Sequence, residues 1–134
     1  MFQFVSNIIK WFEKHYLISL IITILTAIFI FYMSSKPFYA GAPGPQFLLK
    51  PYLYHFGIFA ILAFFFSITI IKGNHKMKSL ILIVILFALA YGVLDELHQL
   101  FVPNISCSID DVITDAAGIM SAAVFYISNL ILRK

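Results

Sequence analysis

Four long apolar runs dominate the sequence and limit what the chain can fold into. They cover residues 17–33, 52–71, 80–102 and 109–132, and within them acidic residues occur only near the end of the third run and the start of the fourth. A membrane-spanning helix needs about 20 mostly apolar residues, and the runs lack the repeated alternation of a transmembrane barrel. The sequence therefore predicts an all-α membrane protein, in which a single domain over residues 1–134 forms a bundle of four transmembrane helices.

Composition supports this fold class and excludes several others. Hydrophobic residues make up 62% of the chain and charged residues 11%, against about 45–50% and 25% in soluble proteins. A domain of this size cannot bury so much apolar surface in a water-facing core. A soluble enzyme, a nucleic-acid-binding domain and a disulfide-stabilised secreted domain are excluded, the last also because Cys107 is the only cysteine.

The segment before the first run has helical amphipathicity. Apolar residues recur at steps of three and four, with charged residues on the other side; the apolar set is Phe2, Val5, Ile9, Phe12 and Tyr16, and the charged set is Lys10, Glu13 and Lys14. This pattern predicts a short interfacial helix. A cleaved signal peptide is disfavoured because the apolar run that follows is longer than the usual core of about 7–15 residues.

The basic residues predict the orientation in the cell membrane. Seven of the nine lie at the two termini or in the connection between the second and third runs, namely Lys10, Lys14, Lys72, Lys76, Lys78, Arg133 and Lys134. By the positive-inside rule both termini are expected in the cytoplasm. The connections 34–50 and 103–108 are then expected at the extracytoplasmic face. Exposed aromatic faces would allow a homo-oligomer, although no motif requires one.

The acidic residues are concentrated where that face is expected. Five of the six lie between positions 95 and 115: Asp95, Glu96, Asp110, Asp111 and Asp115. An ionisable group within a membrane span costs about 2.5–3.5 kcal/mol on translocon scales and marks a functional site by default. Helix capping would account for Asp110 and Asp111 but not for Asp95, Glu96 and Asp115, which are expected deeper in the membrane.

Helical spacing predicts which of these residues meet. Asp95 has His98 and Gln99 three and four positions later, and Glu96 has Gln99 three positions later. In the fourth run a second stripe contains Asp111, Thr114, Asp115 and Gly118, and Ser108 with Asp111 has the spacing of a capping box.

Small residues and a histidine complete the predicted site. Gly118 and Ala122 form a small-x-x-x-small pair that allows close helix packing, and we expect it to bring the third and fourth runs together. Lys50 and His55, at the start of the second run, are expected near the acids, with Lys36 in the preceding connection.

These motifs together resemble the VanZ-like family of small membrane proteins. The resemblance rests on Ser34-Ser35-Lys36-Pro37, Lys50-x4-His55, Asp95-Glu96-x-His98-Gln99-x-Phe101-Val102-Pro103 and Ser108-x-x-Asp111-x3-Asp115-x-x-Gly118. It covers roughly residues 30–122 and implies a link to teicoplanin resistance. Two positions differ from the family pattern: Asn104-Ile105 replaces a usual Gly-Arg, and Asp115 replaces a usual Asn. Both changes make the site more acidic.

Three functions remain open from the sequence. In the first, the site binds membrane lipid or a lipid-linked cell-wall precursor and confers lipoglycopeptide resistance; Lys36, Lys50, His55, Gln99, Ser108 and Thr114 are its candidate binding residues. In the second, a divalent cation such as Mg²⁺, Mn²⁺ or Ca²⁺ supports cleavage of a polyprenyl phosphate or pyrophosphate. Its candidate ligands are Asp95, Glu96, Asp111 and Asp115, and His98 and Glu96 are its candidate catalytic residues.

In the third, the acids, lysines and imidazoles form a structural or transport polar core without catalysis. We recognise no serine or cysteine nucleophile beside a base, which argues against acyl transfer, and nothing in the sequence indicates an activated thiolate at Cys107.

Overall fold

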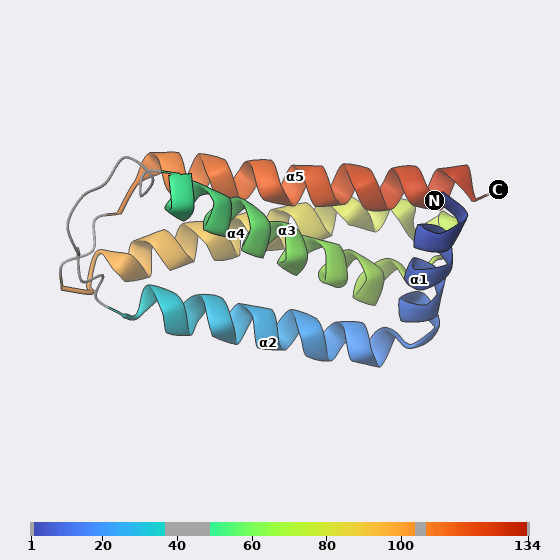
Figure 1. The fold of residues 1–134 in the computed structure, drawn as a ribbon, viewed down its shortest axis with the longest axis horizontal. Helices are drawn as coiled ribbons and strands as arrows, with labels where there is room; N and C mark the ends of the chain where they lie inside the picture. The colour runs from blue at the N-terminus through green and yellow to red at the C-terminus, as the bar shows by residue number, and fades with distance from the viewer. Residues whose placement is uncertain (1, 37–48, 104–106, 134) are drawn as a thin grey trace.

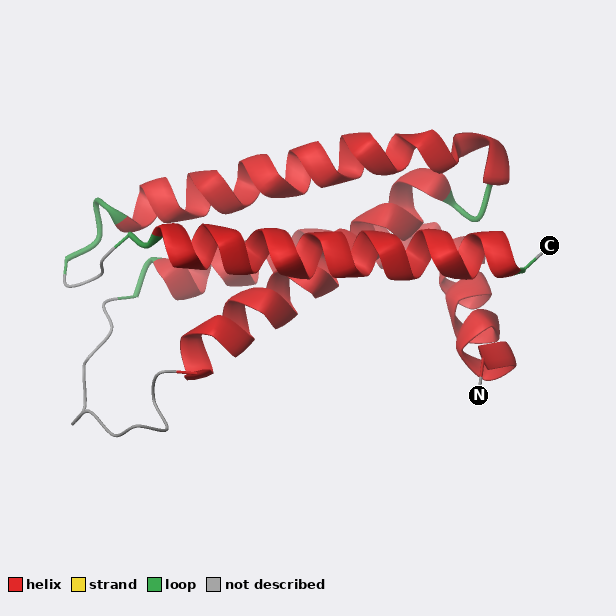
Figure 2. Ribbon diagram, turned by 90° about the horizontal axis from the view of Figure 1, so that it is seen from above, coloured by secondary structure: helices red, strands yellow, loops and turns green. Residues whose placement is uncertain are grey.

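The computed structural model describes residues 2–36, 49–103 and 107–133, apart from the side chains of residues 49–51. Its elements are α1 (Phe2–Lys14), α2 (Tyr16–Ser34), α3 (Leu49–Ile71), the 3-10 helix η2 (His75–Leu80), α4 (Ile81–Gln99) and α5 (Ile109–Leu132). Helices α2 to α5 run alongside one another in an elongated bundle, and α1 lies across the end that holds both termini (Figure 1). The same crossing is visible from above (Figure 2).

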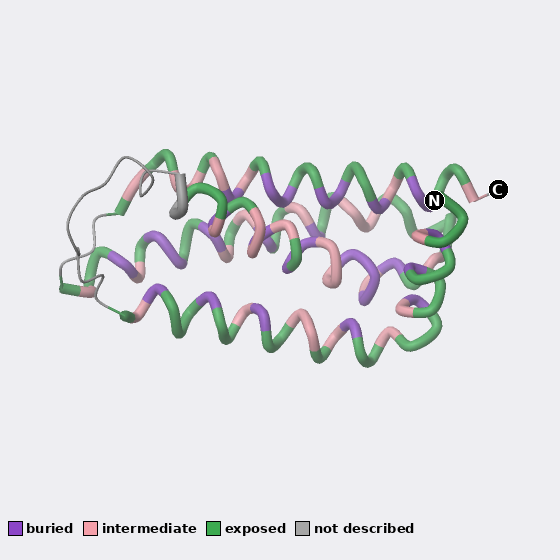
Figure 3. The backbone as a smooth tube through the Cα atoms, in the orientation of Figure 1, coloured by how far each residue is buried: buried purple, intermediate pink, exposed green. Residues whose placement is uncertain are grey.

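Within the part of the chain that the structure describes, four helical segments are long and apolar enough to cross a membrane. They are Tyr16–Ser34, Tyr52–Ile71, His75–Gln99 and Ile109–Leu132. The all-α, multi-pass membrane bundle predicted from the sequence is thus confirmed. Buried residues line the inward sides of the helices, whereas the outward sides are exposed (Figure 3). Large apolar side chains on these outward sides suit contact with lipid tails.

The end of α4 differs from the prediction. The apolar run continues to Val102, but α4 ends at Gln99. Beyond it the amides of Phe101 and Val102 donate to the carbonyls of His98 and Gln99, each 3.0 Å away, and these tight i+3 bonds form a turn before Pro103. Hydrophobicity alone could not locate this end, because Leu100, Phe101 and Val102 are as apolar as the helix. The acids of α4 therefore lie in its last two turns.

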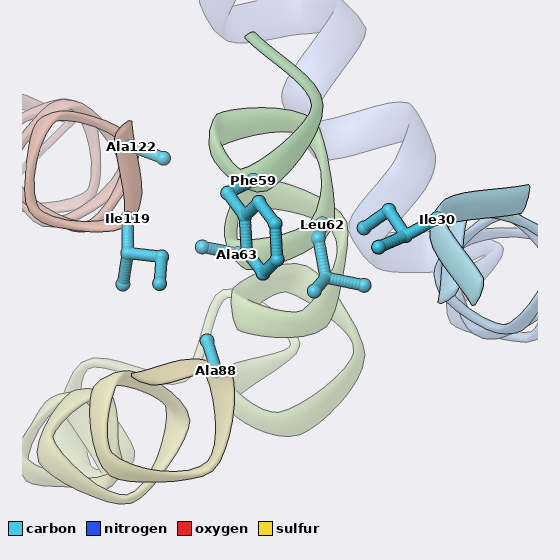
Figure 4. Packing of buried hydrophobic residues seen from close by; sticks show 7 residues of the cluster. All are labelled: Ile30, Phe59, Leu62, Ala63, Ala88, Ile119 and Ala122. Atoms are coloured by element: carbon cyan, nitrogen blue, oxygen red, sulfur yellow. The ribbon is translucent and has the colours of Figure 1, made fainter. Parts of the chain in front are cut away.

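Helix α3 is the centre of the bundle, since it packs against α2, α4 and α5. Its Phe59, Leu62 and Ala63 meet residues from all three neighbours in one apolar cluster. Figure 4 shows the neighbours: Ile30 from α2 faces Leu62, while Ala88 from α4 and Ile119 and Ala122 from α5 surround Phe59 and Ala63.

Gly118 brings α5 against α3. A Cβ added at Gly118 would fall on the backbone carbonyl of Phe56 and beside the amide nitrogen of Ala60. The close approach expected from the Gly118–Ala122 pattern is present, but its partner was predicted wrongly: it is the second span, α3, not the third. A small-residue stripe specifies close packing without specifying which helix fills it.

At the other end of the bundle α1 is attached by apolar contacts and by one buried ion pair. Ile9 is buried, with Val5 and Phe12 packed beside it against α3 and α5. Glu13 was expected on the polar side of α1, and that expectation is wrong: the side chain is buried. Burial of this carboxylate requires partners, because an unpaired charge in a poorly hydrated place is costly.

Those partners come from the far end of the chain. The Arg133 guanidinium donates in a fork to both carboxylate oxygens of Glu13, with Nη1–Oε2 at 2.7 Å and Nη2–Oε1 at 2.9 Å. The Tyr126 hydroxyl donates to Oε1 over 3.0 Å and accepts from the amide of Gly73. Gly73 has a φ of +70°, and a Cβ there would meet the Glu13 carboxylate. We call Glu13, Tyr126, Arg133 and Gly73 the terminal lock.

Candidate functional site

A buried polar cluster lies at the end of the bundle opposite the terminal lock. There α2 and α4 end and α3 and α5 begin, so all four spanning helices contribute side chains (Figure 1). We call the following set the loop-end cluster: Ser34, Ser35, His55, Asp95, Glu96, His98, Gln99, Ser108 and Asp115. Ser35, His98 and Ser108 are half-buried, and the other six are buried. Polar side chains are costly to bury in a membrane helix bundle, and for that reason this cluster is the candidate functional site.

Asp95 joins α4 to α2. The Ser34 hydroxyl donates to Oδ1 of Asp95 over 2.6 Å, and the side-chain amide of Gln99 donates to Oδ2 over 3.3 Å. The predicted i, i+4 pairing of Asp95 with Gln99 is therefore present. The short contact with Ser34 comes from a residue 61 positions away, which no local pattern could have paired with Asp95.

Glu96 joins α4 to the start of α5. Gln99 donates to its Oε1 over 3.1 Å, and the backbone amide of Ser108 donates to its Oε2 over 3.0 Å. Ser108 is the N-cap of α5, and its hydroxyl accepts from the amide of Asp110. The predicted capping box is thus half correct: Ser108 caps the helix, but Glu96, not Asp111, accepts from the amide of Ser108.

His55 and Asp115 join α3 to α5. Nδ1 of His55 lies 2.9 Å from Oδ1 of Asp115, and both side chains are almost fully buried. Oδ2 of Asp115 is buried and has no hydrogen-bond partner among the described residues. It faces Gly92 of α4, where an added Cβ would lie 3.3 Å from Oδ2. Gly92 was missed from the sequence, although its position one turn before Glu96 was a usable signal.

His98 faces α2 rather than the acidic side chains of the cluster. Its Nε2 lies 3.0 Å from the Ser35 hydroxyl, and its ring stacks on Phe31 with centroids 4.7 Å apart. A serine thus lies beside a histidine, a contact that the sequence did not predict. Ser35 is not an activated nucleophile, however, because its hydroxyl donates to the Phe31 carbonyl over 2.6 Å. A hydroxyl that donates to the backbone has no second proton to give the imidazole, so general-base activation would require this bond to break.

Other predicted site residues lie outside the loop-end cluster. Lys36 is exposed and lies over the Tyr32 ring, 4.2 Å from its centroid. The Thr114 hydroxyl donates to the Asp110 carbonyl, which is ordinary back-bonding within a helix. Asp111 is half-buried. Lys50 lies in the first turn of α3, and its side chain is outside the described residues.

The thiol of Cys107 is not poised for chemistry. It is exposed, and desolvation together with the nearby Glu96 carboxylate raises its pKa. A raised pKa lowers the thiolate fraction, in agreement with the sequence.

Among the predicted metal ligands, Glu96 and Asp115 come together and His55 joins them. One possible ligand atom from each of the three lies within 4.8 Å of the others. Asp95 is instead held by Ser34 and Gln99. The imidazole was predicted as a binding residue, and the unexpected packing of α5 on α3 is what places it beside the two carboxylates.

Comparison with known proteins gives one family. The family model described as VanZ/LLP1 matches residues 15–133, which includes every residue of the loop-end cluster. A search of the curated proteins and a search of the solved structures each found no significant match.

Proposed function

The chain belongs to the VanZ/LLP1 family, and from this premise we propose that its loop-end cluster binds the polar headgroup of an envelope lipid or of a lipid-linked cell-wall precursor. The cluster faces the extracytoplasmic side in this proposal, with both termini in the cytoplasm. Binding of that lipid by the protein is proposed to underlie resistance to lipoglycopeptides of the teicoplanin type.

The observation that carries the proposal is the buried polar cluster assembled from all four spanning helices at one end of the bundle. Its carboxylates and imidazoles accept hydrogen bonds from hydroxyl, amide and ammonium groups, which are the donors that sugar, peptide and ethanolamine headgroups provide. Large apolar side chains lie beside it: Phe101 is 85% exposed and Ile109 is 77% exposed. A polar cluster with an apolar rim suits a ligand with a polar head and hydrocarbon chains.

Binding is favoured over catalysis by the positions of the two candidate catalytic residues. Glu96 bonds the start of α5, whereas His98 bonds the end of α2. Residues two apart on a helix do not face each other, so these side chains do not act together on one bond. Metal-assisted cleavage of a polyprenyl phosphate stays a second candidate only because His55, Glu96 and Asp115 are close together.

Lipid binding by variants tests the proposal. Glu96→Gln should weaken binding of phosphatidylethanolamine or of an isoprenoid-linked glycopeptide by at least about tenfold, equivalent to about 1.4 kcal/mol, because the carboxylate is lost while its shape is kept. Native mass spectrometry of the purified protein, titrated with each lipid, measures the change.

The matched control is Asp110→Asn, which removes an exposed acid at the same end of the bundle. It should bind both lipids as the wild type does. Diacylglycerol, which lacks the headgroup, should bind equally to all three proteins. Equal affinity of wild type and Glu96→Gln for the headgroup lipids would contradict the proposal and leave a structural polar core as the role of the cluster.

A further inference from the structure

We propose that His55, Glu96 and Asp115 form a binding site for one divalent transition-metal ion of the Zn²⁺ type. The inference rests on the proposed function in one respect: the ion would lie inside the loop-end cluster and bind oxygen atoms of the lipid headgroup. The ligands come from three different helices, α3, α4 and α5, so the site exists only in the folded bundle.

The geometry of the three side chains suits such an ion. One ligand atom from each residue lies within 4.8 Å of the others. Zn²⁺ binds histidine nitrogen and carboxylate oxygen at about 2.0–2.2 Å, which places ligand atoms about 3.3–3.5 Å apart in a tetrahedral site. Side-chain rotations that move each ligand atom by about 1 Å would complete the coordination.

Charge favours a divalent ion at this place. Glu96 and Asp115 are 2% and 1% exposed, and among the described residues neither has a lysine or arginine partner within ion-pair distance. Two neighbouring carboxylates in a medium of low dielectric constant require protons or a cation. One divalent ion would neutralise both and leave the site with no net charge.

The hydrogen bonds leave one oxygen of Asp115 open and hold its other oxygen beside His55. Oδ2 of Asp115 is buried without a partner among the described residues, and it faces the stripe of α4 that carries Gly92 and, one turn later, Glu96. Nδ1 of His55 lies 2.9 Å from Oδ1 of Asp115, and an ion bound by this nitrogen would take the place of the proton that the two atoms share.

The mixture of ligands favours zinc over the harder ions expected from the acids alone. Mg²⁺ and Ca²⁺ prefer sites made entirely of oxygen, whereas an imidazole with carboxylates suits Zn²⁺ and its neighbours in the transition series. Three protein ligands leave one position open in tetrahedral geometry. A phosphate or hydroxyl oxygen of the headgroup is the ligand class that would fill it.

Metal analysis of the protein in detergent tests the site without lipid. The chain is purified with chelator, dialysed against Zn²⁺ and then against buffer containing Mg²⁺, and its zinc is measured by inductively coupled plasma mass spectrometry. One zinc per chain is expected for the wild type. Glu96→Gln and Asp115→Asn should each weaken zinc affinity by more than about 100-fold. Loss of a residue that only hydrogen-bonds a metal ligand weakens metal affinity by about 10–100-fold, so a larger effect indicates a direct ligand.

Asp95→Asn is the matched control, because Asp95 is also a buried acid of the same cluster but lies outside the ligand set. It should keep its zinc. Helix content by circular dichroism identifies any variant that fails to fold, and a zinc-dependent rise in melting temperature, present in wild type and Asp95→Asn but lost in Asp115→Asn, gives a second measurement.

Absence of zinc from the wild type, displacement of zinc by Mg²⁺, or zinc retained in folded Glu96→Gln and Asp115→Asn would each overturn the site. The proposed function fails separately. A protein that binds the lipid probes but no zinc overturns the metal site alone, whereas one that binds zinc in micelles but none of the lipids overturns lipid binding alone.

Discussion

Replacing Arg133 with methionine should reduce the free energy of unfolding by about 3–5 kcal/mol, the usual cost of removing one partner of a buried ion pair. The side chains of Arg133 and Glu13 are 5% and 8% exposed, so the remaining Glu13 carboxylate would stay buried with only the Tyr126 hydroxyl as a donor. Unfolding in mixed micelles by sodium dodecyl sulfate, followed by circular dichroism, measures the loss.

A double-mutant cycle separates the ion pair from simple loss of packing. Glu13→Gln combined with Arg133→Met removes both charges while the Gln side chain still accepts from Tyr126, so the double variant should be more stable than the sum of the single changes predicts. Lys14→Met is the control, because Lys14 is the exposed neighbour of Glu13 and should change stability by less than about 0.5 kcal/mol. An Arg133→Met effect no larger than that of Lys14→Met would contradict the terminal lock.

Replacing Gly118 with alanine should destabilise the bundle by about 1–3 kcal/mol, the usual cost of overpacking. The new Cβ would press on the Phe56 carbonyl of α3, and a backbone atom cannot rotate away as a side chain does. The helices must separate, and His55, next to Phe56, would then move away from Asp115. Unfolding in the same micelles measures stability, and the chemical shifts of the His55 ring report the contact.

The neighbouring helix provides a matched control. Gly57 of α3 has nothing within 4 Å of the position of an added Cβ. Gly57→Ala should therefore be neutral or stabilise the helix by up to about 1 kcal/mol, the difference in helix propensity. If Gly118→Ala is tolerated as well as Gly57→Ala and leaves the His55 signals unchanged, close packing of α5 on α3 is not what positions the site.

The sequence predicted what depends on local pattern. Span length and hydrophobicity located the four spanning helices, the i, i+4 spacing paired Asp95 with Gln99, and the Ser108 signal located the start of α5. Each of these features is decided within one continuous segment of the chain, by hydrophobicity over a whole span or by spacing within about one turn, so no knowledge of the packing is needed. The family match over residues 15–133 agrees with the resemblance found in the motifs.

The sequence could not predict which helix faces which. Glu13 was placed on a polar face because its partner Arg133 is 120 positions away. The Gly118 stripe was assigned to the third span because nothing in the stripe distinguishes α4 from α3. That error hid the contact between His55 and Asp115, and so the histidine of the candidate metal site was absent from the predicted ligand set.

The expected role of the loop-end cluster in resistance can be measured in cells. The wild-type chain, produced in a susceptible bacterium, should raise the minimal inhibitory concentration of teicoplanin several-fold and leave that of vancomycin, which has no lipid tail, unchanged. Glu96→Gln should abolish the rise, and Asp110→Asn should keep it, when immunoblots show equal amounts of each protein in the membrane. An equal rise for both drugs, or a rise that Glu96→Gln retains, would contradict the proposed binding function.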